Sequence, residues 1–275
     1  MIRRMTVGID LVAYKERVGL GAEPQPDLAS LRAIMMAHVT SVPFENLDVL
    51  LGRPILLDPA SLEHKLVHRR HGGYCFEQNG LLLLVLQQIG FDVTPMAGRV
   101  RVGVPRGVVT PRTHLFLKVR IDGVEWLADV GVGGMSLASP IRFEVGMEQP
   151  TPHEQRRIVY EEGRHYHQAW LGEEWGDVYE FAGDEMPEID RETGNWWTST
   201  SPKAKFKQNL MVALARPDGT RYGIFNDRFT HRRGPELLSE VVIADTEHLY
   251  HLLLQYFGLT GDSPDQLVAC FGLGG

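Results

Sequence analysis

Residues 69–79 read Arg-Arg-His-Gly-Gly-Tyr-Cys-Phe-Glu-Gln-Asn, and no other stretch of the chain is as informative. It places Cys75, one of only two cysteines, behind two glycines at the expected start of a helix. His114 follows 39 residues later, and Asp129 comes 15 residues after that histidine. A thiol, an imidazole and a carboxylate at three element boundaries are the parts of a Cys-His-Asp nucleophilic site.

The residues around this stretch divide into a helical part and a strand-rich part. Up to about residue 90 the apolar side chains recur at helical spacing, and the expected helices lie near residues 10–18, 28–38, 58–67 and 76–88. From Val93 onward, short strands separated by turns favour an antiparallel sheet or small barrel. After Trp197 the pattern is mixed, with one more hairpin and a final helix.

One predicted hairpin bears directly on the candidate site. Residues 114–121 and 124–130 read as two strands joined by a turn at Asp122-Gly123. Antiparallel pairing about this turn would bring His114 and Asp129 close together across the sheet. The thiol of Cys75 would then come from the helical part, where the N-terminal end of a helix stabilises a thiolate.

Composition limits the classes of protein to which the chain can belong. It has 275 residues, 43% of them hydrophobic and 23% charged, with a formal net charge of -7. This balance argues against a globally basic nucleic-acid surface. Two cysteines 195 positions apart make neither a disulfide framework nor a Cys-rich zinc site, so we expect no metal. We see no signal peptide or membrane span and expect a reducing cytoplasm.

Each candidate residue also has a purely structural interpretation. A lone cysteine is usually a small buried hydrophobe, and that is our interpretation of Cys270. His114 is one of eleven histidines, and Asp129 could simply end a strand and accept backbone N–H groups. The glycines at residues 131–134 are too irregular for a dinucleotide fingerprint.

Five segments, taken in order, resemble the arylamine N-acetyltransferase family. They are residues 42–48, 72–79, 113–115, 129–133 and 199–202 with Phe206. The resemblance covers about residues 10 to 260, and the ordered set is far more specific than any one segment. It implies an α+β fold with a cysteine-protease-like core: a helical bundle (1–92) carrying the cysteine, an antiparallel β-barrel (93–200) carrying the histidine and aspartate, and an α/β lid (201–275).

The resemblance also implies an acyltransferase that uses acetyl-CoA by a ping-pong mechanism and needs no metal. Cys75 would take the acetyl group, His114 would act as general base and acid, and Asp129 would orient the imidazole. The acceptor would be an arylamine, an arylhydroxylamine or a hydrazine. For this chain we expect a monomer or a homodimer, with no nucleic-acid or membrane partner.

Further roles carry over from the family by position. Phe44, Val132 and Phe206 would line the acceptor pocket, and Thr113, Gly131 and Gly133 would lie along the CoA cleft. The family usually has an arginine before the two glycines, whereas this chain has His71. The ion pair that this arginine often makes with the glutamate matching Glu45 is therefore in question.

Three other functions stay open from the sequence. The first is an amide synthase that closes a macrolactam from a carrier-bound acyl chain, and the second is a thiol hydrolase using the same three residues on water. The third is a binding module without catalysis, in which Cys75 is structural. A buried structural thiol would not react with iodoacetamide at neutral pH.

Val132 occupies a position that the family often fills with phenylalanine, so we expect a wider acceptor pocket. The variant Val132→Phe should lower the rate with bulky arylamines relative to small ones, because the larger ring fills the space. Acetylation rates for a small and a bulky arylamine would measure this ratio, and an unchanged ratio would contradict the expectation.

Overall fold

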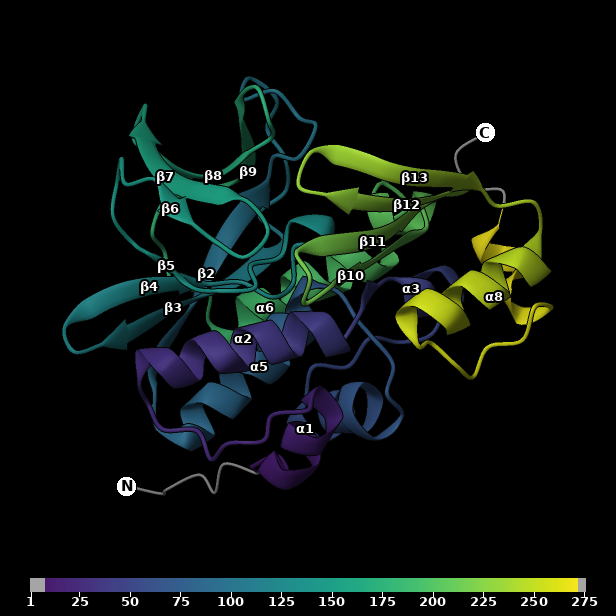
Figure 1. Cartoon of the computed structure of the whole chain (residues 1–275), viewed down its shortest axis with the longest axis horizontal. Coiled ribbons are helices and arrows are strands. Elements are labelled where there is room, and N and C mark those ends of the chain that lie inside the picture. Colours follow the sequence, from purple (N-terminus) through teal and green to yellow (C-terminus); the bar gives the residue numbers. More distant parts are fainter. Residues whose placement is uncertain (1–7, 272–275) are drawn as a thin grey trace.

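Most helices of the first ninety residues lie together in the lower part of the computed structural model, which describes residues 8–271 (Figure 1). Asp10 and Asp27 cap the first two helices by accepting backbone N–H groups. The helical elements are α1 (Leu11–Val18), α2 (Leu28–Ser41), α3 (Leu47–Leu50), α4 (Pro59–Leu62), the π-helical turn η1 (Glu63–His68) and α5 (Cys75–Ile89). As predicted, α5 ends at Gly90 in the left-handed conformation.

The middle of the chain forms an eight-stranded antiparallel sheet that curls into a nearly closed barrel (Figure 1). The strand order is β5-β4-β3-β2-β9-β8-β7-β6. The bounds are β2 (Asp92–Val100), β3 (His114–Ile121), β4 (Val124–Ala128), β5 (Ile141–Arg142), β6 (Gln149–Pro150), β7 (Gln155–Glu161), β8 (Arg164–Trp170) and β9 (Trp175–Phe181). The predicted turn at Asp122-Gly123 joins β3 to β4, so the expected hairpin is confirmed.

A second antiparallel sheet has the order β1-β10-β11-β12-β13. Its strands are β1 (Phe44–Glu45), β10 (Met211–Ala215), β11 (Thr220–Phe225), β12 (Arg228–Arg233) and β13 (Glu236–Val242). The helix α8 (Thr246–Phe257) packs its apolar side chains on this sheet. The sequence predicted the β10–β11 hairpin and α8, but not β1, which pairs with a strand more than 160 residues away.

Two more helices connect the sheets. Helix α6 (Glu188–Thr200) and the short α7 (Lys205–Gln208) follow the barrel. Sequence reasoning missed α6, which has Pro187 at its N-cap, because its many polar residues hide the apolar face. Between residues 8 and 271, no helix is long and apolar enough to cross a membrane.

The paired glycines allow the segment before α5 to lie directly against β1. A Cβ atom built on Gly72 would lie 2.1 Å from the carbonyl oxygen of Pro43. The backbone of Gly73 accepts a hydrogen bond from the N–H of Glu45 at 3.1 Å. A side chain at residue 72 would therefore push β1 away from the helix that carries Cys75.

The variant Gly72→Ala should destabilise the fold by about 2–3 kcal/mol, because a methyl group there overlaps backbone that cannot move aside easily. The matched control is Gly107→Ala, where an added Cβ meets nothing within 4 Å. Urea unfolding would compare both variants with the wild type, and equal midpoints for the two would contradict the close approach.

Candidate active site

Cys75 is the first residue of α5, as the sequence predicted. The carboxylate of Glu77 accepts the backbone N–H of Tyr74 at 3.0 Å and so holds the first turn of the helix. The Cys75 side chain is 4% exposed, and its Sγ donates to the carbonyl oxygen of Thr113 at 3.5 Å. The thiol therefore lies at the positive end of the helix dipole and against the residue before His114.

His114 and Asp129 are brought together by the hairpin, as expected. The imidazole Nε2 lies 2.7 Å from Oδ2 of Asp129, and both side chains are fully buried. This bond engages Nε2, so Nδ1 is the ring nitrogen left for the thiol of Cys75. The ring of Tyr179 packs against the imidazole, with 4.8 Å between ring centroids.

The environment of His114 favours its protonated form. Burial lowers the pKa of His114, but the negative charge of Asp129 and hydrogen bonds to Asp129 and Cys75 outweigh burial. The pKa rises from 6.5 to about 10. A proton taken from the thiol is therefore held firmly on this imidazole.

Asn79 fixes the position of Asp129. Its Nδ2 donates to Oδ1 of Asp129 at 2.8 Å and to the carbonyl oxygen of Leu115 at 2.7 Å. Its Oδ1 accepts the backbone N–H of Val130 at 3.0 Å. Sequence reasoning gave Asn79 no role, although its place one helical turn after Cys75 was the available signal.

Gly131 allows the end of the hairpin to touch the start of α5. A Cβ built on Gly131 would lie 2.8 Å from both the Cα of Cys75 and the Nδ2 of Asn79. Its N–H donates to Oδ1 of Asp129 at 2.9 Å. Gly133 has a φ of +67°, and a Cβ there would approach the ring of Phe44.

Two of the three expected pocket residues meet near Cys75. The ring centroids of Phe44 and Phe206 lie 5.9 Å apart, and the ring centroid of Tyr74 lies 5.2 Å from that of Phe206. These side chains belong to the apolar cluster that includes Cys75. Val132 instead precedes the short turn η2 (Gly133–Met135) and packs on the main core. Tyr74 was not among the pocket residues expected from the sequence.

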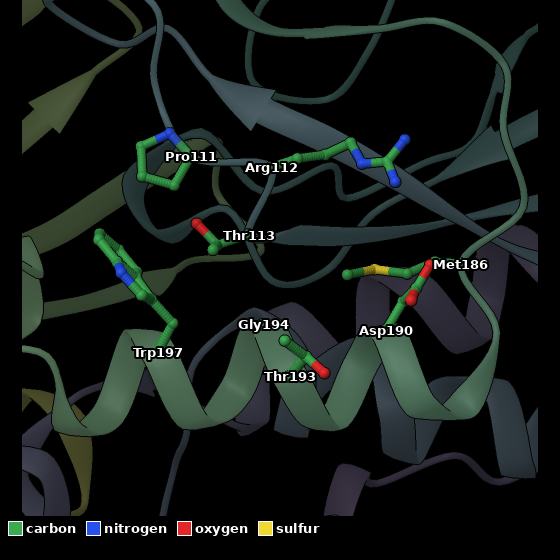
Figure 2. A pocket seen from close by; sticks show the side chains of 8 residues that line it. All are labelled: Pro111, Arg112, Thr113, Met186, Asp190, Thr193, Gly194 and Trp197. Atoms are coloured by element: carbon green, nitrogen blue, oxygen red, sulfur yellow. The ribbon is translucent and has the colours of Figure 1, made fainter.

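A pocket of about 340 Å³ borders Thr113. Figure 2 shows Pro111 and Trp197 at one end of it and Met186 with Asp190 at the other, with Thr113 between them. Its other lining residues are Arg112, Thr193 and Gly194. Because the carbonyl oxygen of Thr113 also accepts the thiol of Cys75, only Thr113 lies between this pocket and Cys75.

The position of the expected family arginine is occupied by the buried His71, whose imidazole lies near Gly261. The cation closest to Glu45 is Lys65, with 3.7 Å between Nζ and Oε1. A lysine from η1 therefore stands beside the buried glutamate. Among residues 8–271, no group of three His, Cys, Asp or Glu side chains could hold a metal ion.

The raised pKa of His114 makes stability depend on pH. The folded state binds the proton more tightly than the unfolded state, so this contribution is complete below about pH 6.5 and is lost as the pH rises through about 10. We expect the difference in free energy of unfolding between wild type and His114→Gln to shrink over that range. Urea unfolding from pH 6 to 10 would measure it, and a constant difference would contradict the assignment.

Comparisons with known proteins show which family the chain is similar to. A family model described as N-acetyltransferase matches residues 27–265. An arylamine N-acetyltransferase / N-hydroxyarylamine O-acetyltransferase from Salmonella typhimurium is 38% identical over 249 residues, covering 90% of this chain and 88% of the relative. An arylamine N-acetyltransferase from Mycolicibacterium smegmatis is 42% identical over 233 residues, covering 83% and 84%.

Solved structures give the same result. The arylamine N-acetyltransferase of Mycobacterium marinum in complex with CoA superposes with a TM-score of 0.89 at 34% identity, covering 95% of this chain and 98% of that one. The Salmonella typhimurium structure also gives 0.89, at 37% identity and with coverage of 94% and 96%. The chain belongs to the arylamine N-acetyltransferase family.

Proposed function

We propose that this chain transfers the acetyl group of acetyl-CoA to the nitrogen of arylamines, arylhydroxylamines and hydrazines. The observation that carries this proposal is the meeting of Cys75, at the start of α5, with the buried pair of His114 and Asp129. The relatives support arylamines as acceptors, since they are named arylamine N-acetyltransferase, one of them also N-hydroxyarylamine O-acetyltransferase.

In the first half-reaction, Nδ1 of His114 takes the proton of the Cys75 thiol. The thiolate attacks the carbonyl carbon of the thioester and forms a new carbon–sulfur bond. When the bond to the CoA sulfur breaks, the imidazolium returns its proton to the departing thiolate. The products are free CoA and an acetyl-cysteine enzyme.

In the second half-reaction, the amine nitrogen attacks the acetyl carbon on Cys75. His114 accepts the proton that the nitrogen loses, and Asp129 stabilises the resulting imidazolium. The bond to Sγ then breaks, and the thiolate regains a proton from His114. Burial of all three side chains keeps water away from the acetyl-enzyme, which favours transfer over hydrolysis.

The substrates would approach Cys75 from two sides. The aromatic rings of Phe44 and Phe206 offer an apolar surface to an acceptor ring. Val132, which packs on the main core, would border this pocket from the segment that ends with Gly133. Thr113, Gly131 and Gly133 would line the route of the CoA arm, and the pocket beside Thr113 supports this route.

Two further expectations accompany this function. The enzyme would work in a reducing compartment such as the cytoplasm, because the reactive Cys75 must stay a free thiol. Its expected state is a monomer or a homodimer, since the Cys-His-Asp site is assembled within one chain.

Initial rates with acetyl-CoA and an arylamine should give parallel double-reciprocal lines, because CoA leaves before the amine reacts. Cys75→Ser and His114→Ala should each lower kcat by about 10³-fold or more. The matched control is Cys270→Ala, since that thiol is buried in the cluster of α8 and should leave the rate unchanged. Hydrolysis of acetyl-CoA unaffected by amine, or activity with carrier-bound thioesters alone, would contradict the proposal.

A further inference from the structure

Lys65 lies among three carboxylates beneath the start of α5. Its Nζ is 2.7 Å from Oδ2 of Asp48, 2.7 Å from Oε1 of Glu77 and 3.7 Å from Oε1 of Glu45. The three carboxylates come from different elements, namely β1, α3 and α5. The lysine side chain is 16% exposed, and Glu45 and Glu77 are almost fully buried.

The two buried glutamates each use their second oxygen on the backbone. Oε2 of Glu77 accepts the N–H of Tyr74 at 3.0 Å, and Oε2 of Glu45 accepts the N–H of Leu47 at 2.6 Å. Each glutamate therefore links Lys65 to a particular backbone amide. One of these amides belongs to the residue directly before Cys75.

Both links end on segments that touch each other. The N–H of Glu45 donates to the carbonyl oxygen of Gly73 at 3.1 Å, and the N–H of Gly73 donates to that of Pro43 at 3.3 Å. Through Glu45 and Glu77, Lys65 therefore binds both of the segments that form this backbone contact. One of these segments continues along the chain into Tyr74 and Cys75. Its element, η1, is π-helical, a conformation that is rare and often found at functional sites.

Charge balance in this cluster depends on Lys65. Burial and the nearby Glu45 raise the pKa of Glu77 to about 7, even though Lys65 opposes the rise. A second cation, Arg53, lies on the more exposed side of the cluster. Its Nη1 is 3.0 Å from Oδ1 of Asp48, and its Nη2 binds Asp262. Within residues 8–271, Lys65 is the only cation that forms an ion pair with either buried glutamate, so its loss would leave both of them unpaired.

We propose that Lys65 is a positioning residue for the reaction of Cys75, acting through Glu77 and Glu45. Its ammonium group fixes the first turn of α5 against β1, and it offsets negative charge that would otherwise disfavour the thiolate. The charged groups around the thiolate are His114 and Asp129 from the hairpin, and Glu77, Glu45, Asp48 and Lys65 from the helical side. This role rests on the proposed function, because it concerns the nucleophile of that reaction.

The test is the rate of Cys75 alkylation by iodoacetamide between pH 5 and 10, which needs no acyl donor. A chain that took no acetyl group would therefore still report on Lys65. We expect Lys65→Met to raise the apparent pKa of the thiol by about one unit and to slow alkylation at pH 7 by about 10-fold. Lys65→Arg should restore the wild-type profile to within about 3-fold, since it keeps the charge.

Two further variants separate a role in charge from one in folding alone. Glu77→Gln should lower the apparent pKa, opposite to Lys65→Met, because it removes a negative charge. In the double variant Lys65→Met with Glu77→Gln, the apparent pKa of the Cys75 thiol should return towards the wild-type value. A disordered helix start would instead raise the pKa in every variant, which would overturn the proposal.

The matched control is Lys118→Met, because Lys118 pairs with Glu125 on the barrel at 2.9 Å, and its profile should be that of the wild type. A wild-type profile for Lys65→Met would overturn the proposal. If Lys65→Met does not fold, Glu77→Gln and Lys65→Arg decide the question. An unchanged apparent pKa in Glu77→Gln, or a raised one in Lys65→Arg, would overturn it.

Discussion

The contact between the backbone of Gly131 and the Cα of Cys75 is the constraint on which the site depends. The helix supplies the thiol and the hairpin supplies the imidazole and carboxylate, so the chemistry requires the two to meet without a gap. Asn79 secures the meeting by binding Asp129, the backbone of Leu115 on β3 and the backbone of Val130 just after β4. Any side chain at residue 131 would push Cys75 away from His114.

The same site concentrates charged groups in places that water does not reach. The pair of His114 and Asp129 lies on one side of α5, and Lys65 with its carboxylates lies on the other. Burial of such groups is costly unless each charge has a partner. The structure meets this condition with hydrogen bonds from His114 to Asp129 and from Lys65 to Glu77, and with an ion pair at 3.7 Å between Lys65 and Glu45. Catalytic geometry and charge compensation are therefore parts of one arrangement.

Much of this site could be predicted from the sequence because its signals are local. The turn at Asp122-Gly123 fixes how the two strands pair, and that pairing brings His114 to Asp129. The two glycines and the expected helix start locate Cys75 in the same way. The spacing of Asn79 from Cys75 was a signal in the sequence, but its hydrogen bonds to Asp129, Leu115 and Val130 depend on how the helix meets the hairpin. The ion pairs of Lys65 likewise depend on how three separate elements pack. Strand β1 was not predicted either, because a strand of two residues has no periodic pattern.

The most direct test of the account is the mass of the intact protein after mixing with acetyl-CoA and no acceptor. We expect a gain of one acetyl group on the wild type and none on Cys75→Ser. Adding an arylamine should remove the group from the wild type. An equal gain on Cys75→Ser, or no gain on a wild type whose thiol still reacts with iodoacetamide, would contradict the proposed acetyl-cysteine intermediate.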